Sequence, residues 1–111
     1  MKRAILNVAV GGRYPEGQRR LSTSLDAFGE SAERLFWTDE WPDRPHDSCN
    51  YCMKVDAFLQ AQKDGYDQAL WLDASCWLVK PLDEAWALME RQGYLLGQEG
   101  WTVGQWCAPE V

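Results

Sequence analysis

The sequence predicts a three-layer α/β/α domain with a mostly parallel sheet. Apolar, strand-like runs alternate with amphipathic, helix-like segments along the 111 residues. Such alternation implies parallel strands joined by crossovers, with helices on the faces of the sheet. The run at residues 69–72 is apolar without alternation, which suits a strand buried on both faces and makes it the expected central strand. We therefore expect one domain over residues 1–111.

Glycine and turn-forming residues separate these segments. In chain order we expect strands at residues 4–10, 34–37, 69–72, 94–97 and 101–106. We expect helices at residues 18–28, 52–64 and 80–92. Gly29, Gly65 and Gly93 follow the three helical patterns, where a left-handed residue commonly ends a helix. Residues 13–17 and 38–50 are predicted loops, because turn chemistry replaces apolar periodicity in both.

Each helical segment has one apolar face that we expect to be buried, because apolar residues recur at spacings of three and four. The predicted buried residues are Leu21, Leu25 and Phe28 in the first helix, Cys52, Val55, Phe58, Leu59 and Gln62 in the second, and Leu82, Ala85, Leu88 and Met89 in the third. In the second helix Asp56 lies on the opposite, polar face. Trp71 and Trp86 are expected in the core, whereas the remaining tryptophans fall at strand ends or in loops.

Composition restricts the possible partners. The chain is 46% apolar and 25% charged, as in an ordinary soluble globule. Its formal net charge of −6 argues against nucleic acid or an anionic membrane surface as a partner. No apolar run approaches the roughly 20 residues of a membrane span. The basic start at residues 1–3 resembles that of a signal peptide, but Asn7 and Gly11 interrupt the following run, so we expect a first strand and a cytoplasmic location.

The four cysteines have three possible roles: free thiols, a zinc site or a redox motif. Cys49 and Cys52 form a C-x-x-C pair three residues after His46, while Cys76 and Cys107 stand alone. A zinc site normally has a second close pair, and a redox motif normally follows a strand directly. We predict that Cys49 and Cys52 are free thiols in a reducing compartment, with zinc binding as the main alternative.

Asp73 comes directly after the apolar run at residues 69–72. In open α/β sheets, ligands bind outside the carboxyl ends of the strands, so an Asp at this position can reach a ligand while its backbone stays in the sheet. The alternative is a structural Asp whose side chain caps the next turn. The site hypothesis depends on which of these the structure shows.

Common catalytic motifs are absent from the sequence. There is no G-x-G-x-x-G, P-loop or nucleophile elbow, and a Ser-His-Asp triad would depend on His46 in a predicted loop. Arg13, Arg19, Arg20 and Lys54 all fall near the carboxyl ends of predicted strands or at helix starts. This placement suits a small anionic ligand such as phosphate, although solvated surface charge is an equal alternative.

Several segments together resemble one family. Residues 70–75 read Leu-Trp-Leu-Asp-Ala-Ser, residues 51–54 open a helix with Tyr-Cys-Met-Lys, and residues 93–96 and 100–101 read Gly-Tyr-Leu-Leu and Gly-Trp. The chain is similar in these segments to the GT-A-type glycosyltransferase-like proteins of the nucleotide-diphospho-sugar transferase superfamily. The resemblance extends over nearly the whole chain but covers only the amino-terminal, donor-binding half of such an enzyme.

The resemblance implies a donor site at the end of the central strand. Asp73 matches the first position of the family's D-x-D motif, which holds a divalent cation, Mn²⁺ or Mg²⁺, against the donor diphosphate. Ser75 stands at the third position, where the family has a second carboxylate. The implied donor-binding residues are Val10, Gly11, Arg13, Tyr14, Arg20, Lys54, Asp73 and Ser75, with Asp73 as the metal ligand. Catalytic residues stay unassigned.

Two functional hypotheses follow from this resemblance. The first is a glycosyltransferase-like domain that binds a nucleotide-sugar through a divalent cation. The alternative is a non-catalytic, oligomeric interaction protein that retains the fold without transferase activity. Half of a GT-A sheet leaves an open strand edge and apolar surface, which favour association. We therefore expect a homodimer or larger homo-oligomer with Trp101, Val103 and Trp106 in or near the contact.

Overall fold

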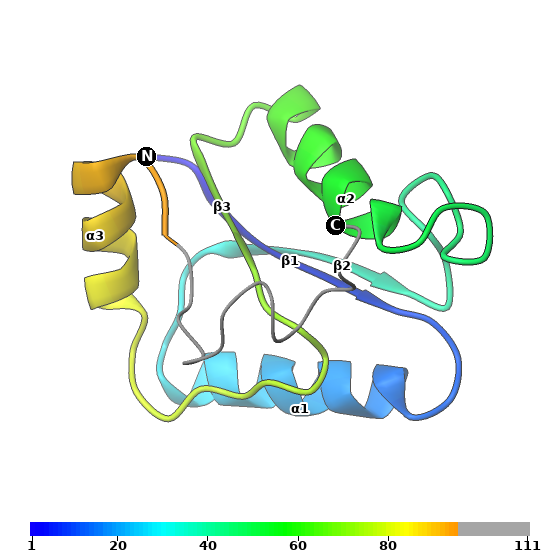
Figure 1. Cartoon of the computed structure of the whole chain (residues 1–111). Helices are drawn as coiled ribbons and strands as arrows, with labels where there is room; N and C mark the ends of the chain where they lie inside the picture. Colours follow the sequence, from blue (N-terminus) through cyan, green and yellow to red (C-terminus); the bar gives the residue numbers. More distant parts are fainter. Residues whose placement is uncertain (96–111) are drawn as a thin grey trace, which may run out of the picture.

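The computed structural model describes residues 1–95, and within them it confirms the predicted α/β fold class. One open sheet of three parallel strands is accompanied by three helices (Figure 1). The elements are β1 (Arg3–Ala9), α1 (Tyr14–Ala27), β2 (Glu33–Thr38), α2 (Cys52–Lys63), β3 (Gln68–Trp71) and α3 (Asp83–Gln92). Tyr94 and Leu95 are not in a strand. The rest of the strand expected at residues 94–97, and the one expected at 101–106, lie outside the described residues.

The sheet has the strand order β2-β1-β3, so β1 is its central strand. Leu6 of β1 pairs with Leu35 of β2 on one side and with Trp71 of β3 on the other. The prediction that residues 69–72 form the central strand is therefore wrong for the described part of the chain. β3 is an edge strand there, and its residues are only half-buried because no further described strand covers them.

Side chains of β1 alternate between two cores, which gives the predicted three layers. Ala4 and Leu6 pack with Ala57 and Ala61 of α2. On the other face, Ile5 is buried with the α1 and α3 residues Leu21, Leu25 and Trp86. Figure 1 shows α2 on the opposite side of the sheet from α1. β1 is thus buried on both faces, as its apolar sequence requires.

The helix α1 begins earlier than predicted. Pro15 lies in its first turn, a position that tolerates proline because the missing N–H would be unpaired there. Gly17 lies inside the helix. Only glycine fits at this position, because a Cβ would stand 2.2 Å from the carbonyl oxygen of Ala74. The expected loop at residues 13–17 is therefore mostly helix. Phe28, expected to be buried, ends α1 as its C-cap and is 39% exposed.

The helix α2 buries a different face from the one that the sequence predicts. Its buried residues are Asp56, Ala57 and Ala61, while Val55, Phe58 and Leu59 are 54%, 41% and 55% exposed. The predicted buried face is therefore wrong. The small alanines allow the helix to approach β1 closely, which bulkier residues would prevent.

A charged contact fixes this orientation of α2. Arg44, from the preceding loop, donates to both carboxylate oxygens of Asp56, at 2.6 Å and 3.1 Å, and its backbone N–H donates to the same carboxylate at 3.1 Å. The hydrogen bond from Arg44 is the main reason that the pKa of Asp56 is lowered and the pKa of Arg44 is raised. A paired and hydrogen-bonded carboxylate can be buried, so Asp56 occupies a core position.

A disulfide joins Cys49 to Cys52 at the start of α2, with the two Cα atoms 5.4 Å apart. The prediction of free thiols is therefore wrong for this pair. The turn that begins α2, in which the Cys52 N–H donates to the Cys49 carbonyl at 3.1 Å, places the two side chains together. Cys76 is free and exposed, and Cys107 lies outside the described residues.

The helix α3 closes as the sequence predicts. Gly93 follows it with a φ of +84°, and its N–H donates to the Met89 carbonyl at 2.7 Å, as in a left-handed C-cap. Trp86 is buried as expected, with Leu82 and Met89 packed against its cluster. No helix within residues 1–95 combines the length and apolar character needed to cross a membrane.

Candidate functional site

A cleft of about 600 Å³ opens at the carboxyl ends of β1 and β3, beside the start of α2. The strand ends, the loop after β3, the start of α1 and the loop before α2 all contribute to its walls. The lining residues are Val8, Val10, Tyr14, Trp41, His46, Asp47, Tyr51, Met53, Lys54, Trp71, Asp73, Ala74 and Ser75. Five of the eight predicted donor-site residues are among them: Val10, Tyr14, Lys54, Asp73 and Ser75. The cleft is the position at which open α/β sheets bind ligands.

The carboxylate of Asp73 is exposed at the end of β3. Its Oδ1 accepts a hydrogen bond from Trp71 Nε1 at 2.6 Å and lies 3.9 Å from Lys54 Nζ. The turn after β3 is closed by the backbone instead, because the Cys76 N–H donates to the Asp73 carbonyl at 2.9 Å. The side chain therefore does not cap that turn, and its carboxylate faces solvent.

Lys54 lies close to two aromatic rings. Its Nζ is 5.7 Å from the ring centre of Tyr51 and 5.5 Å from that of Trp71, within the range of a cation–π interaction. Its ion pair with Asp73 is partly exposed, and such surface pairs contribute at most ~1 kcal/mol. A ligand anion can therefore compete for the Lys54 ammonium group.

A buried hydrogen-bond network holds the end of β3 that carries Asp73. Asn7 Nδ2 donates to the Leu72 carbonyl at 2.7 Å. Gln18 Nε2, from α1, donates to Asn7 Oδ1 at 2.8 Å and to the Trp37 carbonyl at 3.0 Å. Asn7 and Gln18 are both buried, so these bonds form away from water, where an unpaired polar group is costly. The network links β1, β2 and the residue that follows β3 to α1.

The other predicted site residues lie outside the cleft. Arg13 and Arg20 line a neighbouring hollow of about 710 Å³ that shares Tyr14, Ala74 and Ser75 with the cleft. Arg20 donates to the Ser75 carbonyl at 3.3 Å, and its guanidinium lies 4.3 Å from the Trp77 ring centre. Gly11 lines neither space.

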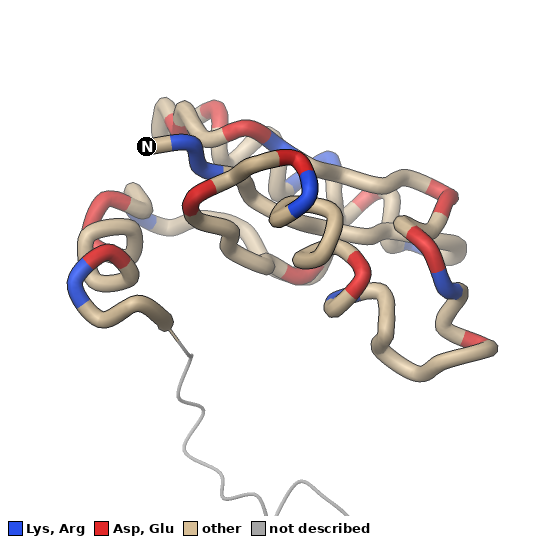
Figure 2. Tube along the Cα trace, turned by 90° about the horizontal axis from the view of Figure 1, so that it is seen from above, with Lys and Arg blue, Asp and Glu red and all other residues tan. Residues whose placement is uncertain are grey.

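The predicted cations are partly neutralised by neighbours. Arg13 Nε donates to Glu16 at 3.0 Å, and this hydrogen bond lowers the pKa of Glu16. Basic and acidic residues are interspersed along the chain trace (Figure 2), and Lys54 and Asp73 form one ion pair. The site therefore combines paired charges with aromatic surface, and is not a block of like charge.

The loop before α2 supplies residues that the sequence analysis did not assign to the site. Trp41, His46, Asp47 and Tyr51 line the cleft. His46 Nδ1 accepts a hydrogen bond from the Tyr51 N–H at 3.1 Å, and the two rings meet edge to face at 4.8 Å. Because this loop has no periodicity, its sequence gives no indication of which side chains face inward.

The donor set does not by itself suit Mn²⁺ or Mg²⁺. These hard cations take several oxygen ligands, and no group of three or more His, Cys, Asp or Glu within residues 1–95 is placed to hold a metal ion. The Asp73 carboxylate lies 3.9 Å from the Lys54 ammonium group. Ser75 stands at the position where the resemblance implies a second carboxylate. The described residues therefore do not build the divalent-cation site that the resemblance implies.

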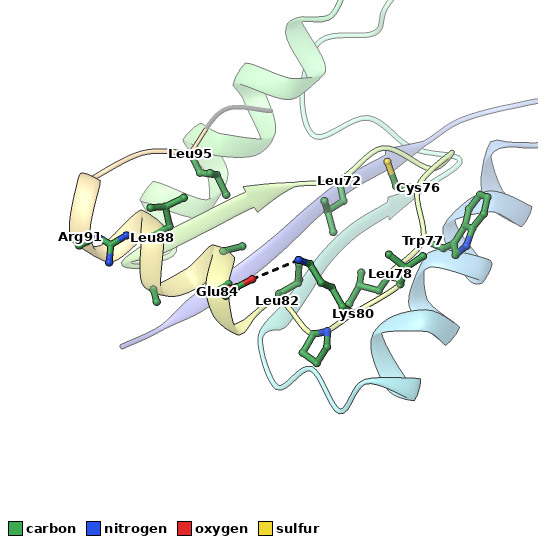
Figure 3. Close-up of a pocket in the computed structure, with 14 residues that line it drawn as sticks. Leu72, Cys76, Trp77, Leu78, Lys80, Leu82, Glu84, Leu88, Arg91 and Leu95 are labelled. Atoms are coloured by element: carbon green, nitrogen blue, oxygen red, sulfur yellow. Dashed lines mark hydrogen bonds and ion pairs between the residues drawn. The ribbon is translucent and has the colours of Figure 1, made fainter. Parts of the chain in front are cut away.

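A separate apolar groove of about 780 Å³ lies between the loop after β3 and α3 (Figure 3). Leucines dominate its labelled side chains, among them Leu72, Leu78 and Leu88, and its lining does not include Asp73. Lys80 and Glu84 form an ion pair of 3.5 Å in it. The groove contains none of the predicted donor-site residues.

Comparison of the chain with protein-family models, with curated proteins and with solved structures finds no match. The resemblance to GT-A-type glycosyltransferase-like proteins therefore stays a prediction. The assignment of a function depends on the geometry of the cleft.

Proposed function

We propose that the cleft binds a nucleotide-sugar through its diphosphate, as the donor-binding domain of a cytoplasmic glycosyltransferase-like protein. One observation carries the proposal: Lys54 and Asp73 lie 3.9 Å apart at the carboxyl end of β3, next to the rings of Tyr51 and Trp71. A few polar groups among aromatic walls are typical of small-molecule sites. Together they suit a ligand with one anionic part and one flat or apolar part.

Each group in the cleft has a distinct role in this proposal. The Lys54 ammonium exchanges Asp73 for the ligand diphosphate, a charge-assisted contact. The carboxylate of Asp73 then accepts hydrogen bonds from sugar hydroxyl groups. Mn²⁺ or Mg²⁺ would bind only together with the ligand, because Mg²⁺ is usually held by one or two carboxylates together with substrate phosphates.

The substitution Asp73→Asn tests the proposal. Asp73 is exposed and does not cap the turn, so the free energy of unfolding should change by less than ~1 kcal/mol. The affinity for the best-binding nucleotide-sugar should fall at least about tenfold, equivalent to ~1.4 kcal/mol, because the charged acceptor of its sugar hydroxyl groups is lost. Melting temperature and calorimetric affinity are measured on the same variant, with Mg²⁺, with Mn²⁺ and with EDTA.

A matched control separates the cleft from general surface charge. Lys54→Gln should weaken binding as Asp73→Asn does. Lys80→Gln removes a cation of a comparable exposed ion pair outside the cleft and should leave binding unchanged. A destabilised Asp73→Asn protein whose response to ligands is unaltered would contradict the proposal.

A second candidate function is a non-catalytic, homo-oligomeric interaction protein. It is favoured by the exposure of Val55, Phe58 and Leu59 on α2, because contiguous apolar surface often marks an interface. The contact residues predicted from sequence, Trp101, Val103 and Trp106, lie outside the described residues. Light scattering at tens of micromolar should then show a dimer that Phe58→Asp dissociates, and a monomer would count against this candidate.

A further inference from the structure

The disulfide between Cys49 and Cys52 lies next to the cleft. Between the two cysteines stands Tyr51, whose ring lines the cleft. The N–H of Tyr51 donates to His46 at 3.1 Å, and its ring faces Lys54 Nζ at 5.7 Å. The disulfide therefore closes a short ring of backbone around a residue that contacts two other cleft residues.

The backbone of Tyr51 is held in an unfavourable conformation. It has a φ of +60°, in the left-handed region. Residues with a Cβ avoid this region for steric reasons, and a bulky one stays there only where the surrounding structure imposes it. The short disulfide loop around Tyr51 is one such restraint, and the hydrogen bond to His46 is another. Opening the disulfide removes the covalent restraint and leaves the weaker one.

We propose that Cys49 and Cys52 form a thiol–disulfide exchange site, reduced by a dithiol, whose oxidised state holds the Tyr51 wall of the cleft in position to bind ligand. A thiolate of the dithiol attacks Cys49 Sγ and forms a mixed disulfide, while Cys52 leaves as a thiolate. The second thiol of the reductant then displaces Cys49. Two electrons and two protons pass to the protein, and the reductant becomes a disulfide.

The position of the pair supports this exchange. Cys52 is the first residue of α2, and a helix N-terminus stabilises a thiolate, which makes Cys52 the better leaving group. Both cysteines are half-buried and therefore accessible in part. In a reducing compartment, persistent disulfides are rare unless they take part in redox chemistry. A structural role alone would leave a predicted cytoplasmic protein with a bond that its surroundings remove.

The consequence for ligand binding rests on the proposed function, and two measurements separate the two proposals. His46 is the single histidine of the chain, so its Hε1 proton gives one assignable NMR signal that reports on Tyr51 without any ligand. We expect this signal to shift between the oxidised and the dithiothreitol-treated protein. UDP or GDP, whichever binds more tightly, should bind the oxidised protein at least about tenfold more tightly than the reduced protein.

Chemical controls identify the cysteines. Alkylation of the air-oxidised protein should leave Cys49 and Cys52 unmodified, and both should react after reduction. Cys49→Ser should match the reduced protein in both measurements. Cys76→Ser, which removes an exposed free thiol within the described residues, should behave as the unsubstituted protein does.

The outcomes are distinct. Alkylation of Cys49 and Cys52 without reduction, or equal UDP or GDP affinity in the two states, would overturn the redox proposal and leave the proposed function standing. If neither nucleotide binds either state, the proposed function fails. In that case the His46 signal alone tests whether the disulfide fixes the position of Tyr51. A signal that is the same in the oxidised and reduced proteins overturns the redox proposal.

Discussion

The helices α1 and α2 cover opposite faces of the same sheet but meet it with different kinds of surface. α1 buries Leu21 and Leu25 completely, as its apolar periodicity predicts. α2 buries two alanines and Asp56 and turns Val55, Phe58 and Leu59 toward solvent. Although both segments contain an apolar stripe, only the stripe of α1 is used for the described core.

The difference shows that a polar anchor and close packing can decide which face of a helix is buried. The bidentate contact of Arg44 with Asp56 ties the loop before α2 to the helix. That loop carries Trp41, His46 and Asp47 into the cleft. The orientation of α2 thus determines the walls of the candidate site, whereas the orientation of α1 determines the core beneath it.

The largest expected effect comes from the core that α1 forms with the sheet. Leu25→Ala removes a fully buried side chain and should lower the free energy of unfolding by ~2–5 kcal/mol, because the cavity left in the core collapses only in part. Leu59→Ala removes the same atoms from an exposed position on α2 and should change it by no more than ~0.5 kcal/mol. Urea unfolding of both variants provides the measurement.

Protein concentration sharpens this test. A loss in Leu59→Ala that grows with protein concentration would indicate that the exposed stripe of α2 is covered by a second copy of the chain, because association adds to apparent stability by mass action. If both variants lost the same free energy of unfolding at every protein concentration, the assignment of Leu25 to a buried face and Leu59 to an exposed face would be contradicted.

The second prediction concerns the contact of α1 with the loop that carries Asp73. Alanine is favoured over glycine in a helix interior by about 1 kcal/mol. In Gly17→Ala, however, the new Cβ would stand 2.2 Å from the Ala74 carbonyl oxygen, and overpacking of this kind costs ~1–3 kcal/mol. We therefore expect net destabilisation by thermal unfolding, with Thr23→Ala at an exposed site of α1 as the control. A stabilised Gly17→Ala protein would show that α1 and the loop are not in close contact.

The smallest expected effect tests the polar anchor of α2 through pH. The pKa of Asp56 is lowered from its ordinary value of 3.8, chiefly by the hydrogen bond from Arg44. A carboxyl whose pKa is lowered by folding stabilises the protein above its unfolded pKa, and this stabilisation is lost as pH falls through the folded pKa. The melting temperatures of the unsubstituted protein and of Asp56→Asn should therefore differ at pH 7 and converge below pH ~3.8. A constant difference across this range would assign the effect to packing.

The residues that line the candidate site were only partly predictable from sequence. Asp73 and Lys54 could be placed at the cleft because strand ends and helix starts are visible in the apolar pattern, and parallel strands bring such positions to one edge. Asn7, buried under the cleft, had one signal in the sequence: it interrupts an otherwise apolar strand. His46 and Tyr51 had none, because their positions at the cleft depend on the conformation of a loop without periodicity.

The sequence by itself determined the alternation of strands and helices from β1 to α3, the helix ends at glycine and the burial of Leu21 and Leu25, because these depend on local propensity and on the spacing of apolar residues. Only the tertiary structure decided that β1 is the central strand of the described sheet, that α2 buries Asp56, and that Cys49 pairs with Cys52. The first two depend on contacts between segments that are distant in the chain, and the disulfide depends on the turn that begins α2. Arg44 can compensate the buried charge of Asp56 only once the loop has folded against the helix, and no pattern within α2 records that partner.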